Sequence, residues 1–372
     1  MKKLKNIHFK LKYYNFRLIF FIISLTLLGI IVIGSAAPGQ NYQMKQLIGM
    51  ILGAIIMLAL SVIDYRFLLN LHWIEYGVCV FLLILVLIPG VGKNVKGAQR
   101  WIPIGSDSGI NIQPSEFAKL IMIICLARLL STNHTGFKTW KSLIPVAGMM
   151  FLPTILIFIQ PDLGTSLVFA AIAFGMLYIC GLRMELVKRA LIALVVMFPV
   201  IWFFVLNSYQ KMRILVLFNP SVDPYGSGYH VIQSKISIGS GGFLGQGLFE
   251  GTQSQLNFLP ENHTDFIFSV IGEELGFIGA IFVIFLYFVL LYRTIMISRS
   301  SGDSFGSLLA CGIFSMWLFQ VFINVGMTLG IMPVTGIPLP FMSYGGSALV
   351  MNLLCVGILM NIYLRRKKLM ID

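Results

Sequence analysis

Residues 17–37 read RLIFFIISLTLLGIIVIGSAA, an apolar run of helix length whose only charge is at its first position. About twenty such residues form a helix that crosses the ~30 Å hydrocarbon core of a membrane. Similar runs recur along the chain, and we expect ten spans, at 17–37, 46–63, 74–91, 115–131, 142–160, 164–181, 187–206, 264–292, 307–331 and 342–364. The sequence therefore predicts an all-α polytopic membrane protein, with residues 1–372 forming one integral membrane domain.

The composition supports this class. Of the 372 residues, 58% are hydrophobic and 11% are charged, whereas soluble domains carry about 25% charged residues. An ordinary soluble enzyme is therefore excluded. The 5 cysteines all lie within apolar runs, which indicates small buried hydrophobic side chains rather than disulfides or thiolate metal ligands.

The basic residues indicate the orientation in the membrane. With the N-terminus in the cytoplasm and ten spans, most of the 27 lysines and arginines fall on the cytoplasmic side, as the positive-inside rule requires. Residues 1–16 then form a basic cytoplasmic tail, and the C-terminus is also cytoplasmic. The net charge of +13 is mostly a topology signal, and we expect no nucleic-acid partner. The first apolar run is too long for a cleaved signal sequence, so we expect it to remain as a helix.

Two outer segments interrupt the helical pattern, residues 92–113 and residues 207–263, the latter between spans seven and eight. A loop as long as the second is usually functional in a compact bundle. Its glycine-rich run, 239–247, lacks the Lys-Ser/Thr ending of a phosphate-binding loop. We expect those glycines to permit tight turns and close backbone packing rather than to bind a nucleotide.

The carboxylates are distributed opposite to the bases. Ionisable groups at membrane depth are costly, and they are candidates for function by default. Nine acids fall on the outer side or just inside outer helix ends: Asp107, Glu116, Asp162, Asp223, Glu250, Glu261, Asp265, Glu273 and Glu274. Any chemistry is therefore expected to face outward. No spacing typical of metal ligands is visible, because the outer histidines, His230 and His263, are far apart in sequence.

Glu116 and Lys119 follow Pro114, a residue suited to the first turn of a helix. Their spacing of three places them on one helix face, near the outer end of the fourth span, where they can pair. The spacing alone leaves two interpretations open. The pair either neutralises two awkward charges or contributes to a functional cavity.

Asp162 and Asp265 each stand at the expected start of a span. A carboxylate there accepts helix N–H bonds and meets the positive end of the helix dipole. For Asp162 capping is the simpler interpretation, whereas for Asp265 capping and general-base chemistry are equally compatible with the position. Glu273 and Glu274 follow on the same span but on other faces. At least one of them must find another partner in the bundle.

Together, these stretches resemble the SEDS family of bacterial cell-wall polymerases, which contains RodA, FtsW and SpoVE. The resemblance runs in order over most of the chain. It is carried by GAQRWI (97–102), IQPSEFAK (112–119), QPDLGT (160–165), DPYGSGY (223–229), QS (233–234), GSGG (239–242), LPENHTDF (259–266), GEELG (272–276) and PLPFMSYGG (338–346).

The resemblance implies a peptidoglycan glycosyltransferase at the outer face of the bacterial cytoplasmic (inner) membrane, with lipid II as substrate and a class B penicillin-binding protein as transpeptidase partner. It implies that Asp265 is the essential general base, and that Glu116, Lys119 and Asp162 belong to an outward cavity. The departing pyrophosphate needs positive charge. The available outer cations are Arg100, Lys119, Lys211 and Arg213, and a divalent cation, Mg²⁺ or Mn²⁺, could assist.

Three alternatives remain open on the sequence. A polar cavity among Gly- and Pro-interrupted helices also suits a flippase or transporter of the lipid-linked precursor, although the acids gather at the outer face. A scaffold that positions penicillin-binding proteins is a second alternative. Within the family, the short tails and compact layout favour RodA-like elongation over FtsW-like division.

Overall fold

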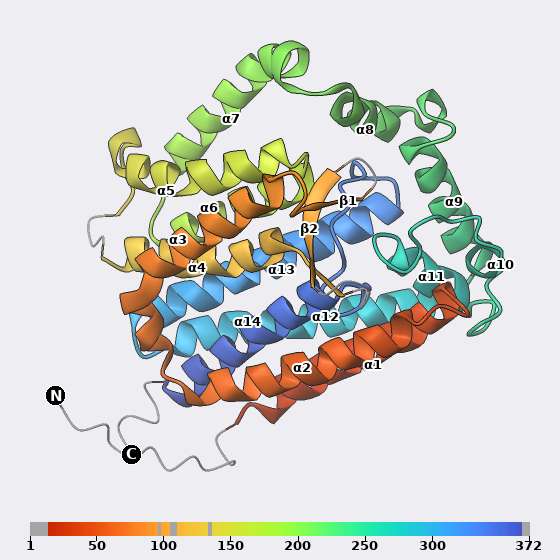
Figure 1. Ribbon diagram of the computed structural model, residues 1–372, viewed down its shortest axis with the longest axis horizontal. Coiled ribbons are helices and arrows are strands. Elements are labelled where there is room, and N and C mark those ends of the chain that lie inside the picture. Colours follow the sequence, from red (N-terminus) through yellow and green to blue (C-terminus); the bar gives the residue numbers. More distant parts are fainter. Residues whose placement is uncertain (1–13, 96–97, 105–109, 133–135, 367–372) are drawn as a thin grey trace.

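The computed structural model describes residues 14–95, 98–104, 110–132 and 136–366, and these are mostly helical (Figure 1). A long helix overlaps each predicted span, although the bounds differ. The helices are α1 Phe16–Ala36, α2 Tyr42–Val62, α3 Leu68–Leu87, α4 Pro114–Ser131, α5 Trp140–Ile159, α6 Leu163–Ile179, α7 Met184–Val200, α12 Gly276–Ser300, α13 Ser304–Thr328 and α14 Gly346–Leu364. The all-α polytopic class is thereby confirmed.

Eight helical segments within the described residues are long and apolar enough to cross a membrane. Of the remaining long helices, α6 is shorter, and α4 carries the charged side chains Glu116, Lys119 and Arg128. A helix that buries such groups against its neighbours does not need an apolar surface all round. Ten spans therefore stay a prediction, although ten helices occupy the predicted places.

The core of the bundle is built around α13 and α14. Helix α13 packs against α4, α6 and α12, and α14 packs against α2 and α4. Trp317 of α13 is fully buried, and its Nε1 donates a hydrogen bond of 2.7 Å to Asn352 Oδ1 of α14. In contrast, α7 and the π-helical turn η3 Ile201–Val205 lie at the edge of the molecule (Figure 1). Only 6% of that span is buried.

The third helix begins earlier than the sequence predicted. The predicted span was 74–91, whereas the short 3-10 turn η2 Tyr65–Phe67 leads directly into α3 Leu68–Leu87. Asp64 caps this turn, because its Oδ1 accepts a hydrogen bond of 3.0 Å from Arg66 N. Apolar periodicity alone does not reveal such a cap.

The outer segment 92–113 contains a small antiparallel sheet. Its strands are β1 Lys93–Val95, β2 Ala98–Ile104 and β3 Ile110–Ile112, in the order β1-β2-β3. Ile102 stands opposite Ile112 in the second pairing. The sheet contacts α3, α4 and α14, so it fixes β2 against the outer end of the bundle.

The outer segment 207–263 is more regular than expected. It is not irregular throughout, because it contains α8 Ser208–Phe218, η4 Pro220–Val222, α9 Ser227–Ser240 and α10 Thr252–Gln255. Two of these helices begin at side-chain caps. Gln210 Oε1 accepts from Asn207 N at 3.1 Å, and Asp223 Oδ2 accepts from Ser227 N at 2.7 Å. Short, polar helices of this kind do not give the long apolar run that identifies a span.

The predicted span 264–292 is divided into two helices, α11 Ile267–Glu274 and α12 Gly276–Ser300. Gly276 at the break has φ of 64°, a conformation that favours glycine. The glycine-rich run packs onto this break. Gln246 N and Gly247 N donate to the carbonyls of Glu273 and Glu274 at 3.0 and 3.1 Å, as expected for glycines that permit close backbone packing.

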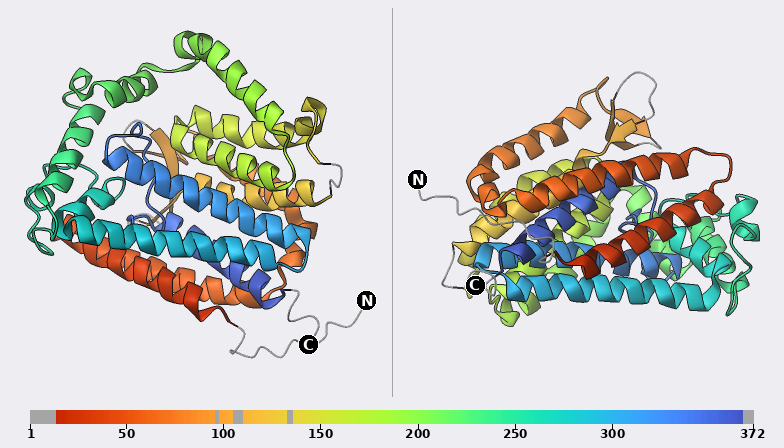
Figure 2. Two further views of the ribbon diagram at one scale, coloured as in Figure 1. Left: turned by 180° about the vertical axis from the view of Figure 1, so that it is seen from behind. Right: turned by 90° about the horizontal axis from the view of Figure 1, so that it is seen from below.

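After α13 the chain returns into the bundle without a helix, over residues 329–345, which we call the return segment. It connects α13 to α14 at the end of the molecule that carries α10 and α11 (Figures 1 and 2). The described chain begins and ends at the opposite end, which we call the terminal end. The two ends are therefore distinct surfaces of one bundle.

Candidate functional site

Asp265 is held in place through its own backbone. Asn324 of α13 is fully buried, and its Nδ2 donates to Asp265 O at 2.9 Å and to Ile337 O at 2.8 Å. One amide group therefore joins Asp265, two residues before α11, to the return segment. The Asp265 residue itself is only partly buried.

The two residues before Asp265 are tied to the return segment as well. Ser343 Oγ donates to Thr264 O at 2.6 Å, and Tyr344 N donates to His263 O at 2.9 Å. The His263 ring stacks on Tyr42 of α2, with 4.6 Å between centroids. Residues 263–265 are consequently fixed between the return segment, α13 and the start of α2.

The Asp265 carboxylate lies beside the return segment, which also contacts the start of α6. A Cβ added to Gly336 would lie 3.4 Å from Asp265 Oδ2, and Gly336 itself has φ of 72°. A Cβ added to Gly164, in the first turn of α6, would lie 2.8 Å from Thr335 O. Gly164 leaves no room for a Cβ, and the positive φ of Gly336 favours glycine there, so the return segment contacts both Asp265 and the first turn of α6.

Asp162 caps α6, as its position predicted. Its Oδ1 accepts from Thr165 N at 3.1 Å, and its Oδ2 accepts from Thr165 Oγ1 at 3.0 Å. Arg100 Nη1 lies 3.9 Å from the same Oδ2. The Asp162 residue is 5% exposed, so its carboxylate is buried and bound mainly to the first turn of α6.

Arg100, on β2, holds the turn between α5 and α6. Its Nε donates to Gln160 O at 2.9 Å, and its Nη2 donates to Pro161 O. The sequence singled out this arginine as an outer cation for a leaving pyrophosphate. Its guanidinium is instead bound largely to these two carbonyl groups, which makes it a residue that positions the start of α6.

Glu116 and Lys119 form the pair that their spacing predicted. Lys119 Nζ lies 2.8 Å from Glu116 Oε1, and the two residues are 1% and 3% exposed. Within the described residues, Glu116 Oε2 and the neighbouring Ser115 Oγ are buried without a hydrogen-bond partner. Buried polar atoms normally have hydrogen-bond partners. Glu116 Oε2 and Ser115 Oγ can therefore bind a hydroxyl group or a water molecule.

Lys211 and Arg213 lie on α8. The Arg213 guanidinium sits 4.4 Å from the centroid of the Tyr209 ring on its own helix. Met212 and Val216 of α8 join a cluster of apolar side chains with Phe266, which places α8 next to the Asp265 segment. Within the described residues, neither cation makes an ion pair.

The remaining acids of α11 are structural. Glu273 accepts hydrogen bonds from Ser237 Oγ at 2.9 Å, from Ser254 Oγ at 2.6 Å and from Gln253 N at 2.7 Å. Glu274 accepts from Ser35 Oγ at the end of α1. The prediction that at least one of them finds another partner in the bundle is confirmed.

Sequence reasoning assigned no role to Asn324, Gly336 or Ser343. Asn324 is a polar side chain within an apolar span, which is itself a signal of function or of a specific partner. Ser343 belongs to a quoted motif of the family resemblance, but only the folded chain brings it to Thr264. Within the described residues, no group of three His, Cys, Asp or Glu side chains is arranged to hold a metal ion.

The fold and these buried polar groups define a polytopic membrane protein with a fixed carboxylate near one end. Residues 15–368 match the profile of the cell cycle protein family of FtsW, RodA and SpoVE. Peptidoglycan glycosyltransferase MrdB of Escherichia coli (strain K12) is 39% identical over 349 residues, which cover 94% of this chain and 93% of that protein. Stage V sporulation protein E of Bacillus subtilis (strain 168) is 40% identical over 359 residues, with 93% and 96% covered.

Solved structures are similar too. A chain of a peptidoglycan synthase complex, described as coordinating polymerization and crosslinking, gives a TM-score of 0.81 at 33% identity, with 94% of this chain and 97% of that chain covered. The rod shape determining protein RodA of Thermus thermophilus gives 0.71 at 29% identity, with 95% and 98% covered. The chain therefore belongs to the FtsW, RodA and SpoVE family, the SEDS glycosyltransferases.

Proposed function

We propose that this protein polymerises lipid II into glycan strands at the outer face of the bacterial cytoplasmic membrane, with Asp265 as the general base. The observation that carries the assignment is the fixation of residues 263–265 by Asn324, Ser343 and Tyr344. A base must be held within hydrogen-bond reach of the proton that it removes. A partly buried carboxylate on such a fixed backbone meets that requirement.

In the proposed reaction, the 4-hydroxyl of the acceptor sugar attacks the anomeric carbon of the donor. Asp265 takes the hydroxyl proton, the new glycosidic bond forms, and the bond to undecaprenyl pyrophosphate breaks. A single displacement of this kind inverts the anomeric carbon. The activated donor supplies the driving force, so the reaction needs no nucleotide.

The leaving pyrophosphate needs compensating positive charge. Arg100 is committed to two carbonyl groups, and Lys119 is paired with Glu116. We therefore assign this role to Lys211 and Arg213 of α8, beside the Asp265 segment. Within the described residues, no three acidic, histidine or cysteine side chains are grouped to hold Mg²⁺ or Mn²⁺.

Glu116 and Lys119 are proposed to bind the polar part of the substrate. The unpartnered Glu116 Oε2 and Ser115 Oγ support this role, because a sugar hydroxyl or a bridging water would satisfy both atoms. Asp162 and Arg100 are proposed to act indirectly, by fixing the start of α6 next to the return segment.

Polymerisation of purified lipid II in detergent tests the proposal. Asp265→Asn protein is expected to lose at least about a hundredfold in rate, the lower range for general-base catalysis. Glu250→Gln is the matched control, because Glu250 is an exposed acid of the outer segment 207–263, which precedes Asp265 in the chain. Glycan strands formed without a bilayer would also separate a polymerase from a flippase. A wild-type rate for Asp265→Asn would contradict the assignment.

We further propose a role in cell elongation with a class B penicillin-binding protein as partner. The similarity to RodA and to a chain of a synthase complex supports this. The test is expression in strains depleted of either the elongation or the division polymerase. Rescue of rod shape supports the proposal, and rescue of division alone contradicts it.

A further inference from the structure

A cavity of about 380 Å³ opens at the terminal end, at the opposite end of the bundle from Asp265. Its volume lies within the range of small-molecule sites, roughly 300–1,000 Å³. Its walls are formed by η2 and the start of α3, by the end of α4, and by the start of α13 with its N-cap. The lining residues are Arg66, Leu69, Arg128, Ser131, Thr132, Asp303, Ser304 and Phe305.

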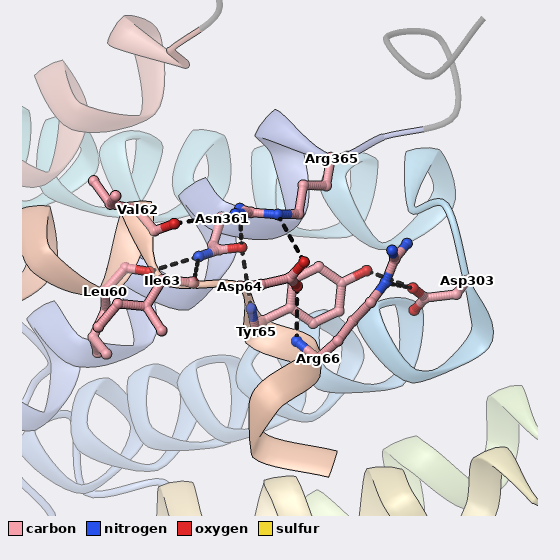
Figure 3. Close-up of polar contacts among 9 residues, drawn as sticks. All are labelled: Leu60, Val62, Ile63, Asp64, Tyr65, Arg66, Asp303, Asn361 and Arg365. Atoms are coloured by element: carbon pink, nitrogen blue, oxygen red, sulfur yellow. Dashed lines mark hydrogen bonds and ion pairs between the residues drawn. The ribbon is translucent and has the colours of Figure 1, made fainter. Parts of the chain in front are cut away.

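Asp303, the acid of this cavity, already accepts hydrogen bonds from three donors. Asp303 Oδ2 accepts from Tyr65 OH at 2.7 Å and from Arg66 Nε at 2.9 Å. Its Oδ1 accepts from Gly306 N at 2.7 Å and thereby caps α13. Figure 3 shows Arg66 facing Asp303 through Nε, with its two terminal nitrogens directed away from the carboxylate. No described carboxylate pairs with those terminal nitrogens, so they can bind another anion.

The second arginine of the cavity is Arg128. Arg128 lies in the last turn of α4, and within the described part of the chain no carboxylate forms an ion pair with its guanidinium. Two guanidinium groups therefore face the cavity against one carboxylate that three donors already engage. Among the described residues, the lining of this cavity therefore carries one more positive charge than negative charge.

The shape of the donors selects the ligand. A guanidinium group presents a planar fork of N–H donors that matches phosphate oxygens in two-point contact. Basic pockets between the cytoplasmic ends of membrane helices are typical sites for phosphate head groups. Leu69 and Phe305 add apolar surface to the same cavity, which suits the glycerol and the first methylenes of a lipid.

We propose that this cavity binds a phosphate-bearing anion, either the head group of an anionic phospholipid or a soluble phosphate, separately from the glycosyl-transfer site. Arg128 and the terminal nitrogens of Arg66 hold the phosphate oxygens. The bound phosphate bridges the ends of α3 and α4 next to the turn between α12 and α13, so it steadies the terminal end of the bundle.

Native mass spectrometry of the full-length protein in detergent tests the proposal. Dioleoyl phosphatidylglycerol is offered in one arm, dioleoyl phosphatidylcholine in a second, and inorganic phosphate competes with phosphatidylglycerol in a third. We expect selective retention of phosphatidylglycerol and about a fivefold loss in Arg128→Gln, the effect of one basic residue near a membrane surface. Displacement by millimolar inorganic phosphate assigns the site to soluble phosphate, whereas resistance to it assigns the site to the lipid.

Two further variants make the result decisive. Arg189→Gln removes an equal charge from a side chain on α7 that is 66% exposed, and we expect it to retain phosphatidylglycerol as the wild type does. Leu69→Trp keeps every charge but fills the cavity, and we expect it to lose the lipid even if Arg128→Gln does not fold. Unchanged retention in either folded cavity variant, or an equal loss in Arg189→Gln, overturns the proposal.

Discussion

Asn324 is the residue on which the position of Asp265 most directly depends. Replacement by leucine removes both of its hydrogen bonds, to Asp265 O and Ile337 O. Each carbonyl left buried without a partner costs about 1–3 kcal/mol. We expect Asn324→Leu to destabilise the protein and to reduce the turnover number for lipid II polymerisation.

Asn352→Leu is the matched control for Asn324→Leu. It removes the buried partner of Trp317 and is expected to cause a similar loss of thermal stability, but it lies on α14, away from the Asp265 segment. Unfolding temperature and turnover are measured together for both variants. If both lose activity in proportion to their stability, Asn324 has no specific positioning role.

The role of the Glu116–Lys119 pair can be tested by removing one of its charges and then both. Lys119→Met leaves a carboxylate buried and unpaired, which typically destabilises by about 3–5 kcal/mol. The double variant Glu116→Gln, Lys119→Met is expected to regain most of that stability. If the pair binds substrate, the double variant still fails to polymerise lipid II. Recovery of activity together with stability would show that the pair is only structural.

For individual residues, the sequence predicted those contacts that depend on the spacing of residues along one helix. Asp162 caps its own helix, and Glu116 meets Lys119, because residues three apart lie on one helix face. The partners of Arg100 were not predictable in the same way. Gln160 O and Pro161 O are about sixty positions further along the chain. Because every residue has a backbone carbonyl group, the sequence does not indicate which carbonyl groups a side chain will bind.

The break between α11 and α12 is an element-scale feature that glycine makes possible. A Cβ on residue 245 would lie 2.1 Å from Glu274 O, whereas a Cβ on residue 239, in the same run, would meet nothing within 4 Å. We expect Gly245→Ala to destabilise by about 1–3 kcal/mol through this overlap. Gly239→Ala is the control, and equal unfolding temperatures for the two variants would contradict the packing described.

The turn before α13 predicts a pH dependence. Burial alone would raise the pKa of Asp303, but hydrogen bonds from Gly306, Tyr65 and Arg66 hold it below its ordinary value of 3.8. Because the pKa is lower in the folded state, the stabilising contribution is present above the unfolded pKa and is lost as pH falls through the folded pKa. We expect Asp303→Asn to lower the unfolding temperature at pH 7 and to differ less from the wild type near pH 3. A difference that is constant over this range would contradict the predicted role.

Helices were predictable wherever an apolar run was long. The division of the eighth run was not, because α11 and the first turns of α12 are both apolar and the break lies in backbone conformation at Gly276. Helices α8 and α9 were missed for the opposite reason. They are short, polar and capped by side chains, so hydropathy gives no sign of them.

Across the whole molecule, polar groups are divided between two ends. The outer segments, the return segment and Asp265 gather at one end, and the proposed anion cavity with its two arginines lies at the other. Membership of the SEDS family rests on matches over nearly the whole chain, so the resemblance carried by the motifs is confirmed. The assembly of the Asp265 site was not predictable, because it unites segments from α2, α6, α13 and the return segment.

The most direct test of the proposed chemistry is the amount of glycan polymer that Asp265→Asn protein makes from purified lipid II. Protein that inserts and unfolds like the wild type is compared with Glu250→Gln and with the wild type under identical conditions. The proposed base predicts that polymer is essentially absent for Asp265→Asn and normal for Glu250→Gln. Glycan strands made by Asp265→Asn at the wild-type rate would contradict it.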